Sequence, residues 1–223
     1  MIRLPDYLII RKLARCCAIP TFQSFPVDDT YKTIADKAEG TYSQLRSKFL
    51  AFAAPVLTVD EAMAFVGEVQ KKYYDARHCC YAYMIGPRRE VFRANDNGEP
   101  SGTAGKPILG QINSNELTNV VIAVVRYFGG IKLGTSGLIQ AYKAAAAEAI
   151  AAANIVEKTI DLSLQISFDY LLLNDVMRIV KEEHPTVLKQ DFNIVCTMHL
   201  AQRAAEMPRL RSRLEGLRGV SIE

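Results

Sequence analysis

The feature of this sequence that most constrains its fold is a short apolar run set between two glycine-rich segments. The run extends from Asn119 to Val125, is rich in β-branched residues and ends on Arg126. It is too short for an ordinary globular helix, so it predicts a strand that is buried on both faces. The flanking segments, Gly98 to Gly105 and Gly129 to Gly137, predict turns. We therefore expect one central strand flanked by two glycine-framed turns.

The second of these turns leads into Leu138 to Ala153, which is rich in alanine, free of Gly and Pro, and predicted to be helical. A strand, a glycine turn and a helix in succession can aim free backbone N–H groups and the positive end of a helix dipole at an anion. The segment GGIKLGTSG has neither the Gly-Lys-Ser/Thr ending of a P-loop nor G-x-G-x-x-G spacing. A tight turn that needs positive φ is the other interpretation, and spacing alone does not choose between the two.

Arg126 follows the apolar run directly and precedes Tyr127, Phe128 and two glycines. Its guanidinium is expected to emerge at the carboxyl end of the strand, where a fork of N–H donors suits phosphate. Alternatively, Arg126 pairs with Asp96 or Glu99 and holds the two turns together. One arginine can serve both roles, so both interpretations stay open.

Asp96 and Glu99 lie in a turn that also holds two hydroxyl side chains, Ser101 and Thr103. Such a cluster can supply general acid/base groups or hold a magnesium ion that bridges to phosphate. We favour capping of a helix that begins near Lys106, because Ser and Thr ahead of a proline are ordinary capping residues. Asp96 and Glu99 are the catalytic candidates, and no metal site or cofactor is predicted.

The five cysteines show neither C-x-x-C nor paired metal-ligand spacing, and their number is odd. This pattern favours a reducing cytosol and argues against a disulfide scaffold or a zinc site. We do not expect His78 and Cys79 to form a catalytic pair, because neighbours in a strand point to opposite faces. No apolar run approaches the roughly 20 residues that span a bilayer, so we expect a cytoplasmic protein without a membrane partner.

The rest of the chain reads as two α+β units in succession. The pattern changes between Asn154 and Thr159, where we place the domain boundary. After it, Ile160 to Phe168 alternates apolar and polar residues, as a strand with one buried face does. The elements predicted before the boundary are two strands within Tyr42–Leu57, a helix opened by Thr58 and Glu61 at capping-box spacing, and strands at His78–Ile85 and Glu90–Ala94. Those after it are a helix at about 172–183, two strands meeting near 191–193, a helix at about 202–217 and a strand at 220–222, a β-α-β-β-α-β order that predicts a ferredoxin-like sandwich.

Positive side chains occur in both units, although a net charge of +3 is too small to argue for nucleic acid by itself. Arg46 and Lys48 alternate with Ser47 and are expected on one face of a strand. A charged helix face is usually only solvated, but cations of both units can also form one electrostatic track. In the predicted last helix the positive residues are Arg203, Arg209, Arg211, Arg213 and Arg218.

Four segments of the sequence resemble the IMPACT/YigZ family: DNGEPSGTAGKP, NVVIAVVRYFGGIKLGTSGLIQAY, RSKFLAFAAPV and DARHCCYAY. The resemblance runs from about Tyr31 to the end of the chain. This sequence departs from the usual family pattern at Asn97, at Ser136, where the family has Gly, and at Gln140, where it has Arg. The last departure removes a cation, which puts the role of that position in an anion site in doubt.

The resemblance implies a two-domain α+β fold, with an extension at residues 1–27 that we expect to be flexible, an IMPACT-type domain at 28–155 and a ferredoxin-like domain at 158–223. The first domain is expected to be similar to the second domain of a small-subunit ribosomal protein. The pair is then similar to the last two domains of elongation factor G, which touch the ribosome. Eukaryotic relatives regulate translation through the general-control kinase pathway.

We therefore expect a binding protein that engages RNA or a ribosome-associated partner through a glycine-framed anion site. An enzyme, a hydrolase or transferase acting on a small phosphorylated ligand, is the alternative. In a third interpretation the motif is architectural, and its glycines and Arg126 only hold the first domain together. The predicted anion- or nucleic-acid-binding residues are Arg46, Lys48, Ser101, Thr103, Lys106, Arg126, Gly129, Gly130, Lys132, Gly134, Thr135, Ser136 and Gly137.

Overall fold

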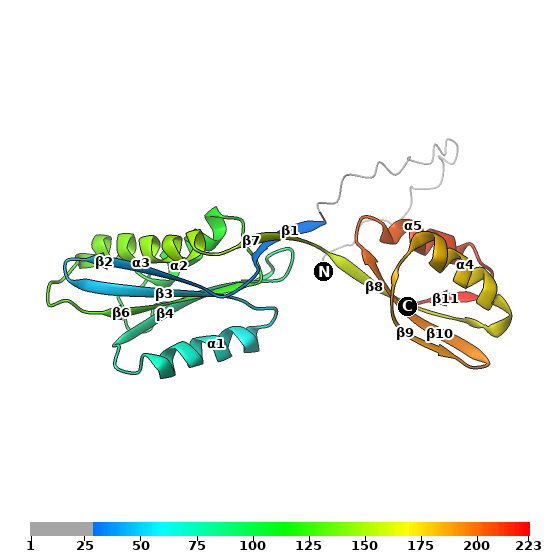
Figure 1. Ribbon diagram of the computed structural model, residues 1–223, viewed down its shortest axis with the longest axis horizontal. Coiled ribbons are helices and arrows are strands. Elements are labelled where there is room, and N and C mark those ends of the chain that lie inside the picture. The colour runs from blue at the N-terminus through cyan, green and yellow to red at the C-terminus, as the bar shows by residue number, and fades with distance from the viewer. Residues whose placement is uncertain (1–28) are drawn as a thin grey trace, which may run out of the picture.

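The computed structural model of the protein describes residues 29–223, which form two α/β bodies joined by a narrow two-stranded ribbon (Figure 1). The predicted extension at residues 1–27 lies outside the described residues. The ribbon pairs β1 (Thr30–Ile34) with β7 (Ile155–Thr159) in antiparallel register, with Thr30 opposite Thr159. It occupies the place where the sequence predicts the domain boundary, while the bounds proposed for the two domains stay a prediction.

The first body is built on a five-stranded antiparallel sheet whose strands follow the spatial order β2-β3-β6-β4-β5. Its central strand, β6 (Val120–Tyr127), is the predicted apolar run, and every residue of it except Tyr127 is buried. The strand begins one residue later than predicted, because Asn119 has a positive φ of 53°. The other strands are β2 (Ala38–Gln44), β3 (Ser47–Pro55), β4 (His78–Ile85) and β5 (Val91–Asn95). The last three lie close to their predicted positions, whereas β2 begins four residues before the predicted span.

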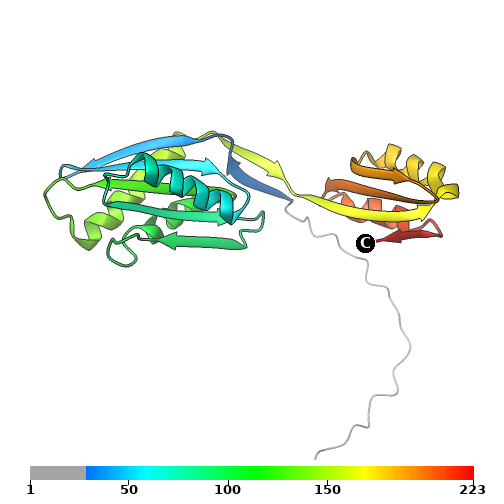
Figure 2. The ribbon, with the colours of Figure 1, turned by 90° about the horizontal axis from the view of Figure 1, so that it is seen from below.

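Helices cover both faces of this sheet, which explains why β6 is apolar on both sides. The helix α1 (Val59–Lys72) packs on one face and crosses in front of the strands in Figure 2. The helices α2 (Gly105–Ser114) and α3 (Gly134–Ala151) pack on the other face. The predicted cap of α1 is confirmed, because Thr58 Oγ1 accepts a hydrogen bond from the Glu61 N–H and Glu61 accepts one from the Leu57 N–H. None of the helices within residues 29–223 is long and apolar enough to cross a membrane.

The second body is a four-stranded antiparallel sheet with the order β11-β8-β10-β9 and two helices packed on its apolar face. The predicted sequence of elements is present, but β10 runs on to Arg203, so the last helix begins five residues later than predicted. The cause is the alternation of buried residues in β10, which continues through Gln202. The elements are β8 (Asp161–Asp169), the 3₁₀ turn η1 (Tyr170–Leu172), α4 (Leu173–Glu183), β9 (Thr186–Phe192), β10 (Val195–Arg203), α5 (Met207–Glu215) and β11 (Val220–Ile222).

Gly40 is the point at which β2 comes closest to α3. A Cβ atom on Gly40 would lie 2.3 Å from the backbone nitrogen of Ala149. Backbone atoms cannot rotate away as a side chain does, so the helix would have to move off the sheet. Only glycine allows this contact.

We expect Gly40→Ala to lower the free energy of unfolding by about 1–3 kcal/mol, the usual cost of forcing extra atoms into a packed core. The matched control is Gly67→Ala in α1, where an added Cβ meets nothing within 4 Å. That change should raise stability by about 0.5–1 kcal/mol, because alanine favours helix more than glycine does. Urea unfolding of the three proteins measures both effects. Equal stability of Gly40→Ala and the parent would contradict the close packing of α3 on β2.

Asp29, immediately before β1, ties the ribbon to the second body. Its carboxylate accepts two hydrogen bonds from Arg203 at the end of β10, from Nε at 2.6 Å and from NH2 at 2.9 Å. The Ala205 N–H donates a third at 3.3 Å. The hydrogen bond from Arg203 is the main reason why the pKa of Asp29 lies below its ordinary value.

Asp29→Asn should therefore lower stability at neutral pH. A carboxylate whose pKa is lowered on folding stabilises the folded state above its unfolded pKa, about 3.9, and this contribution is lost as the pH falls towards the folded pKa. The stability difference between parent and variant should accordingly be constant near neutral pH and shrink in acid. Urea unfolding along a pH series measures it, with Asp36→Asn at an exposed loop position as the control. A difference that grows in acid would contradict this role.

Candidate functional site

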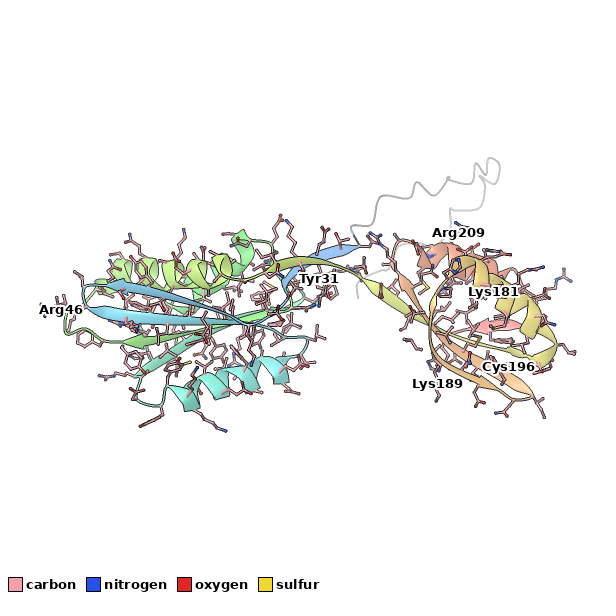
Figure 3. All side chains as sticks on the ribbon, viewed as in Figure 1. Tyr31, Arg46, Lys181, Lys189, Cys196 and Arg209 are labelled. Atoms are coloured by element: carbon pink, nitrogen blue, oxygen red, sulfur yellow. The ribbon has the colours of Figure 1, made fainter. Side chains whose placement is uncertain are left out.

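The two glycine-rich segments meet at the end of the first body that lies farthest from the ribbon. Figure 3 shows Arg46 at this extremity, and we call residues 45–48, 96–104 and 128–137 the distal end. The register of the sheet places His78 opposite Arg126, and the His78 ring lies beside Gly98. A Cβ on Gly129 would lie 2.1 Å from the carbonyl carbon of Arg46, so the two backbones touch. Both glycine-rich segments thus lie at the same end of the sheet.

The first glycine-rich segment is held by the Asp96 carboxylate. Its two oxygens accept hydrogen bonds from the N–H groups of Gly102, Ala104 and Gly105, at 2.8, 3.0 and 2.8 Å. Burial raises the pKa of Asp96, but these three donors outweigh it, and the pKa lies below its ordinary value. Asp96 thus stays ionised and caps the start of α2 from a distance.

The favoured capping interpretation is correct for Asp96 and wrong for the two hydroxyl residues. Thr103 is buried and its hydroxyl donates to the Pro100 carbonyl oxygen at 2.7 Å, so it closes the turn instead of capping the helix. Ser101 is exposed. The residue at the cap position of α2 is Ala104, which has no side-chain oxygen to offer.

Arg126 points into the body instead of emerging at the end of its strand. Its NH1 donates to Glu99 Oε1 at 2.7 Å, and the exposed fractions of the two side chains are only 9% and 3%. The guanidinium carbon lies 5.6 Å from the ring centres of both Phe49 and Phe128. The expectation of an accessible guanidinium is corrected here, because Glu99 turns inward and draws Arg126 with it. The alternative, an arginine that pairs with Glu99, is what the structure shows.

The buried pair belongs to a chain of polar contacts that the sequence analysis did not identify. Tyr142 from α3 donates its hydroxyl to Glu99 Oε1 at 3.0 Å, and Cys80 Sγ donates to the Tyr142 oxygen at 3.3 Å. A tyrosine within the apolar, alanine-rich face of α3 was the available signal, because a buried hydroxyl needs a partner. Burial raises the pKa of Cys80 to about 12 and that of Cys79 to about 11, so both thiols stay protonated and inert as nucleophiles.

The second glycine-rich segment leaves backbone donors at the surface. Gly130 and Gly134 have positive φ values of 89° and 72°, conformations that favour glycine. The Gly129 N–H donates to Ser47 Oγ at 3.1 Å, which anchors the loop to β3. The helix α3 begins at Gly134, four residues earlier than predicted, and no side chain caps it. Its exposed first turn, with Thr135 and Ser136, therefore presents amide donors and the positive end of the helix dipole to solvent.

Cations and apolar side chains surround these donors. Arg46 does not share a strand face with Lys48, because Leu45 and Arg46 form the two-residue turn between β2 and β3, with φ values of 45° and 64°. Both cations are nevertheless exposed at the distal end, as is Lys132, and Lys106 is exposed next to it in the first turn of α2. No salt bridge joins these four to a carboxylate of residues 29–223. The apolar residues are Leu45, Phe128 and Ile131, which are 52%, 57% and 44% exposed.

Four of the five arginines predicted for the last helix pair with carboxylates, which argues against a track through both bodies. Arg209 and Arg213 both contact Glu183, which is almost fully buried, and Arg213 also contacts Glu182. Arg211 pairs with Glu215 one helical turn away. Two of the predicted helix residues lie elsewhere, since Arg203 ends β10 and pairs with Asp29, and Arg218 follows α5.

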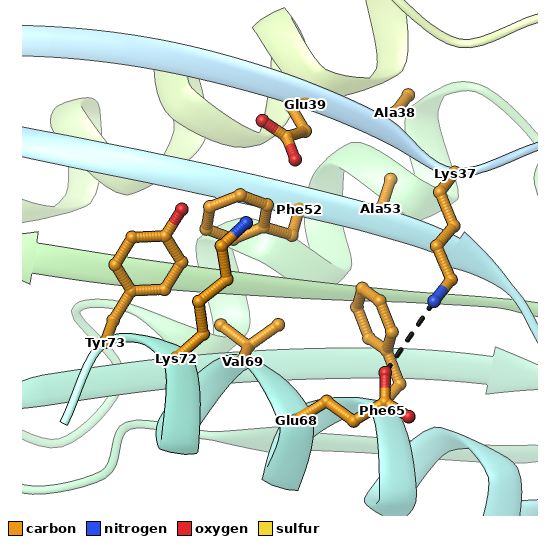
Figure 4. A pocket seen from close by; sticks show the side chains of 10 residues that line it. All are labelled: Lys37, Ala38, Glu39, Phe52, Ala53, Phe65, Glu68, Val69, Lys72 and Tyr73. Atoms are coloured by element: carbon orange, nitrogen blue, oxygen red, sulfur yellow. Dashed lines mark ion pairs between the residues drawn. The ribbon is translucent and has the colours of Figure 1, made fainter.

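A separate hollow lies between α1 and the β2–β3 hairpin and contains none of the predicted site residues. Its floor is aromatic, and Lys72 lies over the rings of Phe52 and Tyr73 (Figure 4). Lys37 lies over Phe65 and pairs with Glu68 at 3.7 Å. Lys37 and Lys72 already interact with neighbouring side chains of this hollow. The distal end is therefore the better candidate site.

We expect Glu99→Gln to lower the free energy of unfolding by about 3–5 kcal/mol, because it leaves the guanidinium of Arg126 buried without a counter-ion. Arg126→Met should cost a similar amount by stranding the carboxylate. The double variant retains an acceptor for the Tyr142 hydroxyl and buries no charge, so it should be more stable than either single variant. Urea unfolding of the full double-mutant cycle measures this coupling. Additive losses would show that the pair does not act as a unit.

Comparisons with known proteins agree with this description of the fold. The family model of the Impact N-terminal domain matches residues 45–150. The IMPACT family member YvyE of Bacillus subtilis is 36% identical over 153 residues, which cover 69% of this chain and 70% of YvyE. The IMPACT family member YigZ of Escherichia coli is 30% identical over 171 residues, 76% of this chain and 84% of YigZ. The crystal structure of a hypothetical protein superposes with a TM-score of 0.69 at 28% identity, covering 87% of this chain and 96% of that one. The family resemblance of the motifs is thereby confirmed, and the chain belongs to the IMPACT family.

Proposed function

We propose that this protein acts in translation by binding RNA or a ribosome-associated partner, with its distal end as the RNA-binding surface. Membership of the IMPACT family supports a translation-related role. The RNA contact itself rests on the chemistry of the distal end. In this proposal the surface recognises phosphates and exposed bases, and no reaction takes place there.

One observation carries the proposal: unpaired cations, uncapped helix amides and an exposed aromatic ring occur together at one extremity. Arg46, Lys48 and Lys132 offer charge to a phosphate backbone without first breaking an ion pair. The amides at the start of α3 add hydrogen-bond donors that suit the same anion. The ring of Phe128 offers a face on which a base can stack. Proteins that bind single-stranded RNA combine a positively charged surface with aromatic rings on which bases stack.

Arg126 has a positioning role in this proposal and does not contact the ligand. Its guanidinium lies against the ring of Phe128 and is fixed by Glu99. The side of Phe128 that faces Arg126 is therefore occupied, and the ring is held in place for contacts on its solvent side. The binding residues that remain from the predicted set are those at the surface, above all Arg46, Lys48, Lys132 and the Gly134–Gly137 turn.

The enzymatic alternative receives no comparable support. Asp96 accepts three backbone hydrogen bonds, and Glu99 is paired with Arg126 and Tyr142. Both carboxylates therefore stabilise the loop that carries them. A general acid or base would have to leave these partners in order to reach a substrate.

We also propose that the second body is a ferredoxin-like domain and that the first is similar to the second domain of a small-subunit ribosomal protein. The strand order β11-β8-β10-β9, with both helices on one face, supports the first assignment. The glycine-framed loops at one end of the first body support the assignment of that body to the ribosomal-protein-like fold. These fold analogies support ribosome contact.

Binding of fluorescein-labelled single-stranded RNA, followed by anisotropy across a salt series, tests the proposed function. Lys132→Ala and Arg46→Ala should each weaken binding and reduce the slope of log affinity against log salt by about 0.7, the value for one contact with a single-stranded phosphate backbone. Phe128→Ala should weaken binding about tenfold with little change of slope, because stacking is not an ionic contact.

The matched control is Arg211→Ala, which removes an exposed arginine that is paired with Glu215 in the second body. It should leave both affinity and slope unchanged. Unfolding midpoints of all variants check that the fold is intact. An affinity indifferent to salt, or distal-end variants that bind as the parent does, would refute RNA binding at this surface.

A further inference from the structure

The strand β9 forms one edge of the second body and exposes an unusual amount of apolar surface for an edge strand. Among residues 29–223 it pairs only with β10, and all seven of its residues are exposed. Leu188 and Phe192 are 61% and 40% exposed, and Ile194 in the following turn is 86% exposed. An uncovered edge with free N–H and C=O groups can accept another strand. Pairing with another strand would also bury the exposed apolar side chains of β9.

The charges of β9 identify which strand fits. Lys189 and Asp191 stand on either side of Gln190, and both lie on the sheet face that is not covered by helices, opposite His199 and Thr197 of β10. In an antiparallel pair centred on Gln190, the lysine of each strand lies opposite the aspartate of the other. One Asp191 oxygen accepts a hydrogen bond from the Asn193 side chain at 2.9 Å, and the other has no such bond within the described residues.

We propose that β9 pairs antiparallel with β9 of a second copy of this chain, with Gln190 opposite Gln190 of the partner subunit. Two four-stranded sheets would then continue across a twofold axis. Each Lys189 would face Asp191 of the partner subunit, so the two ion pairs form together. This surface is independent of the distal end, and its test does not depend on RNA binding.

The same register also matches the apolar residues. The pairing of β9 with β10 is regular from Lys189 to Phe192 and shifts at Leu188, which lies in a β-bulge. In a dimer centred on Gln190, the exposed Leu188 would come near Phe192 of the partner subunit. Phe192 pairs with the buried Cys196 in β10, so it lies on the helix side of the sheet, where apolar contacts extend the core. The charged pairs between Lys189 and Asp191 lie in the regular part of β9 and fix both the direction and the register of pairing.

A strand from an unrelated protein would fit this edge less well. Lysine on an edge strand ordinarily discourages pairing, because it would be buried against an apolar neighbour. Here each lysine meets a carboxylate only when the arriving strand carries an acid at the matching position. The sequence Lys-Gln-Asp is complementary to itself when it is reversed, so a second copy satisfies this condition at both positions.

Sedimentation velocity of the full chain over a wide range of concentrations tests the proposal. The parent should show a monomer–dimer equilibrium. Lys189→Asp alone places acids opposite acids, and Asp191→Lys alone places lysines opposite lysines. Each should weaken self-association about tenfold or more. A monomeric parent at every concentration would overturn the proposal, as would single variants that dimerise like the parent.

Mixing the two single variants separates this register from any other. The acidic β9 of Lys189→Asp should pair with the basic β9 of Asp191→Lys, so the mixture should form a heterodimer that neither variant forms alone. The double reversal, Lys189→Asp with Asp191→Lys, should restore self-association. The control is Lys181→Asp on α4, labelled together with Lys189 in Figure 3, which makes the same charge change on another element and should have no effect. Failure of both the mixture and the double reversal to associate would exclude pairing centred on Gln190.

Discussion

The buried ion pair between Arg126 and Glu99 is the interaction on which the distal end of the first body depends. Taking two opposite charges out of water costs several kcal/mol for each ion, and their attraction repays that cost only with good geometry and further hydrogen bonds. Glu99 meets this requirement by accepting from both Arg126 and Tyr142. The pair thereby joins the central strand β6, the loop before α2 and the helix α3. The pair adds a polar link to the apolar packing that these elements share.

This use of Arg126 divides the glycine-rich motif into an inner and an outer layer. The inner layer consists of the buried pair and of Asp96 with its three amide donors, and it sets the backbone positions. The outer layer consists of the cations, the first turn of α3 and the ring of Phe128, which remain in contact with water. A buried guanidinium cannot reach a ligand without abandoning its counter-ion, whereas an exposed lysine loses little by approaching a phosphate. In the proposed function, anion binding therefore belongs to the outer layer.

The sequence predicts those parts of this structure that have a local signal. The β-branched run of β6, the capping of α1 by Thr58 and the alternation in β8 are visible within one short window each. The ribbon of β1 and β7 has no such signal, because two short strands more than a hundred residues apart pair without a distinctive pattern. The turn at Leu45 and Arg46 also cannot be predicted from a local pattern. Its positive φ values usually call for Gly or Asn, and neither is present.

The orientation of Arg126 shows a different limit. The sequence offered two partners for it, solvent anions or a carboxylate of the neighbouring turn, and both are chemically reasonable. The choice depends on whether Glu99 turns inward, and that depends on Tyr142, which comes from a helix later in the chain. Local pattern therefore predicts which residues meet at the distal end, because strand ends and glycine turns fix the backbone. It does not predict which of them are buried, because that follows from packing between distant elements.

Charged side chains are paired differently on the distal end and on the second body, and this difference determines which partner each surface favours. In the second body four of the six arginines pair with carboxylates of the same body, as Arg209 and Arg213 do with Glu183. Lys189 and Asp191 on β9 differ from these, because two positions along one strand separate them by about 7 Å, beyond the reach of a hydrogen bond. Charges that are unpaired within a chain but complementary to themselves in reverse favour a second copy over other partners. Unpaired charges of one sign, as at the distal end, favour a ligand of the opposite sign. The arrangement of charge, more than its net amount, thus distinguishes the two surfaces.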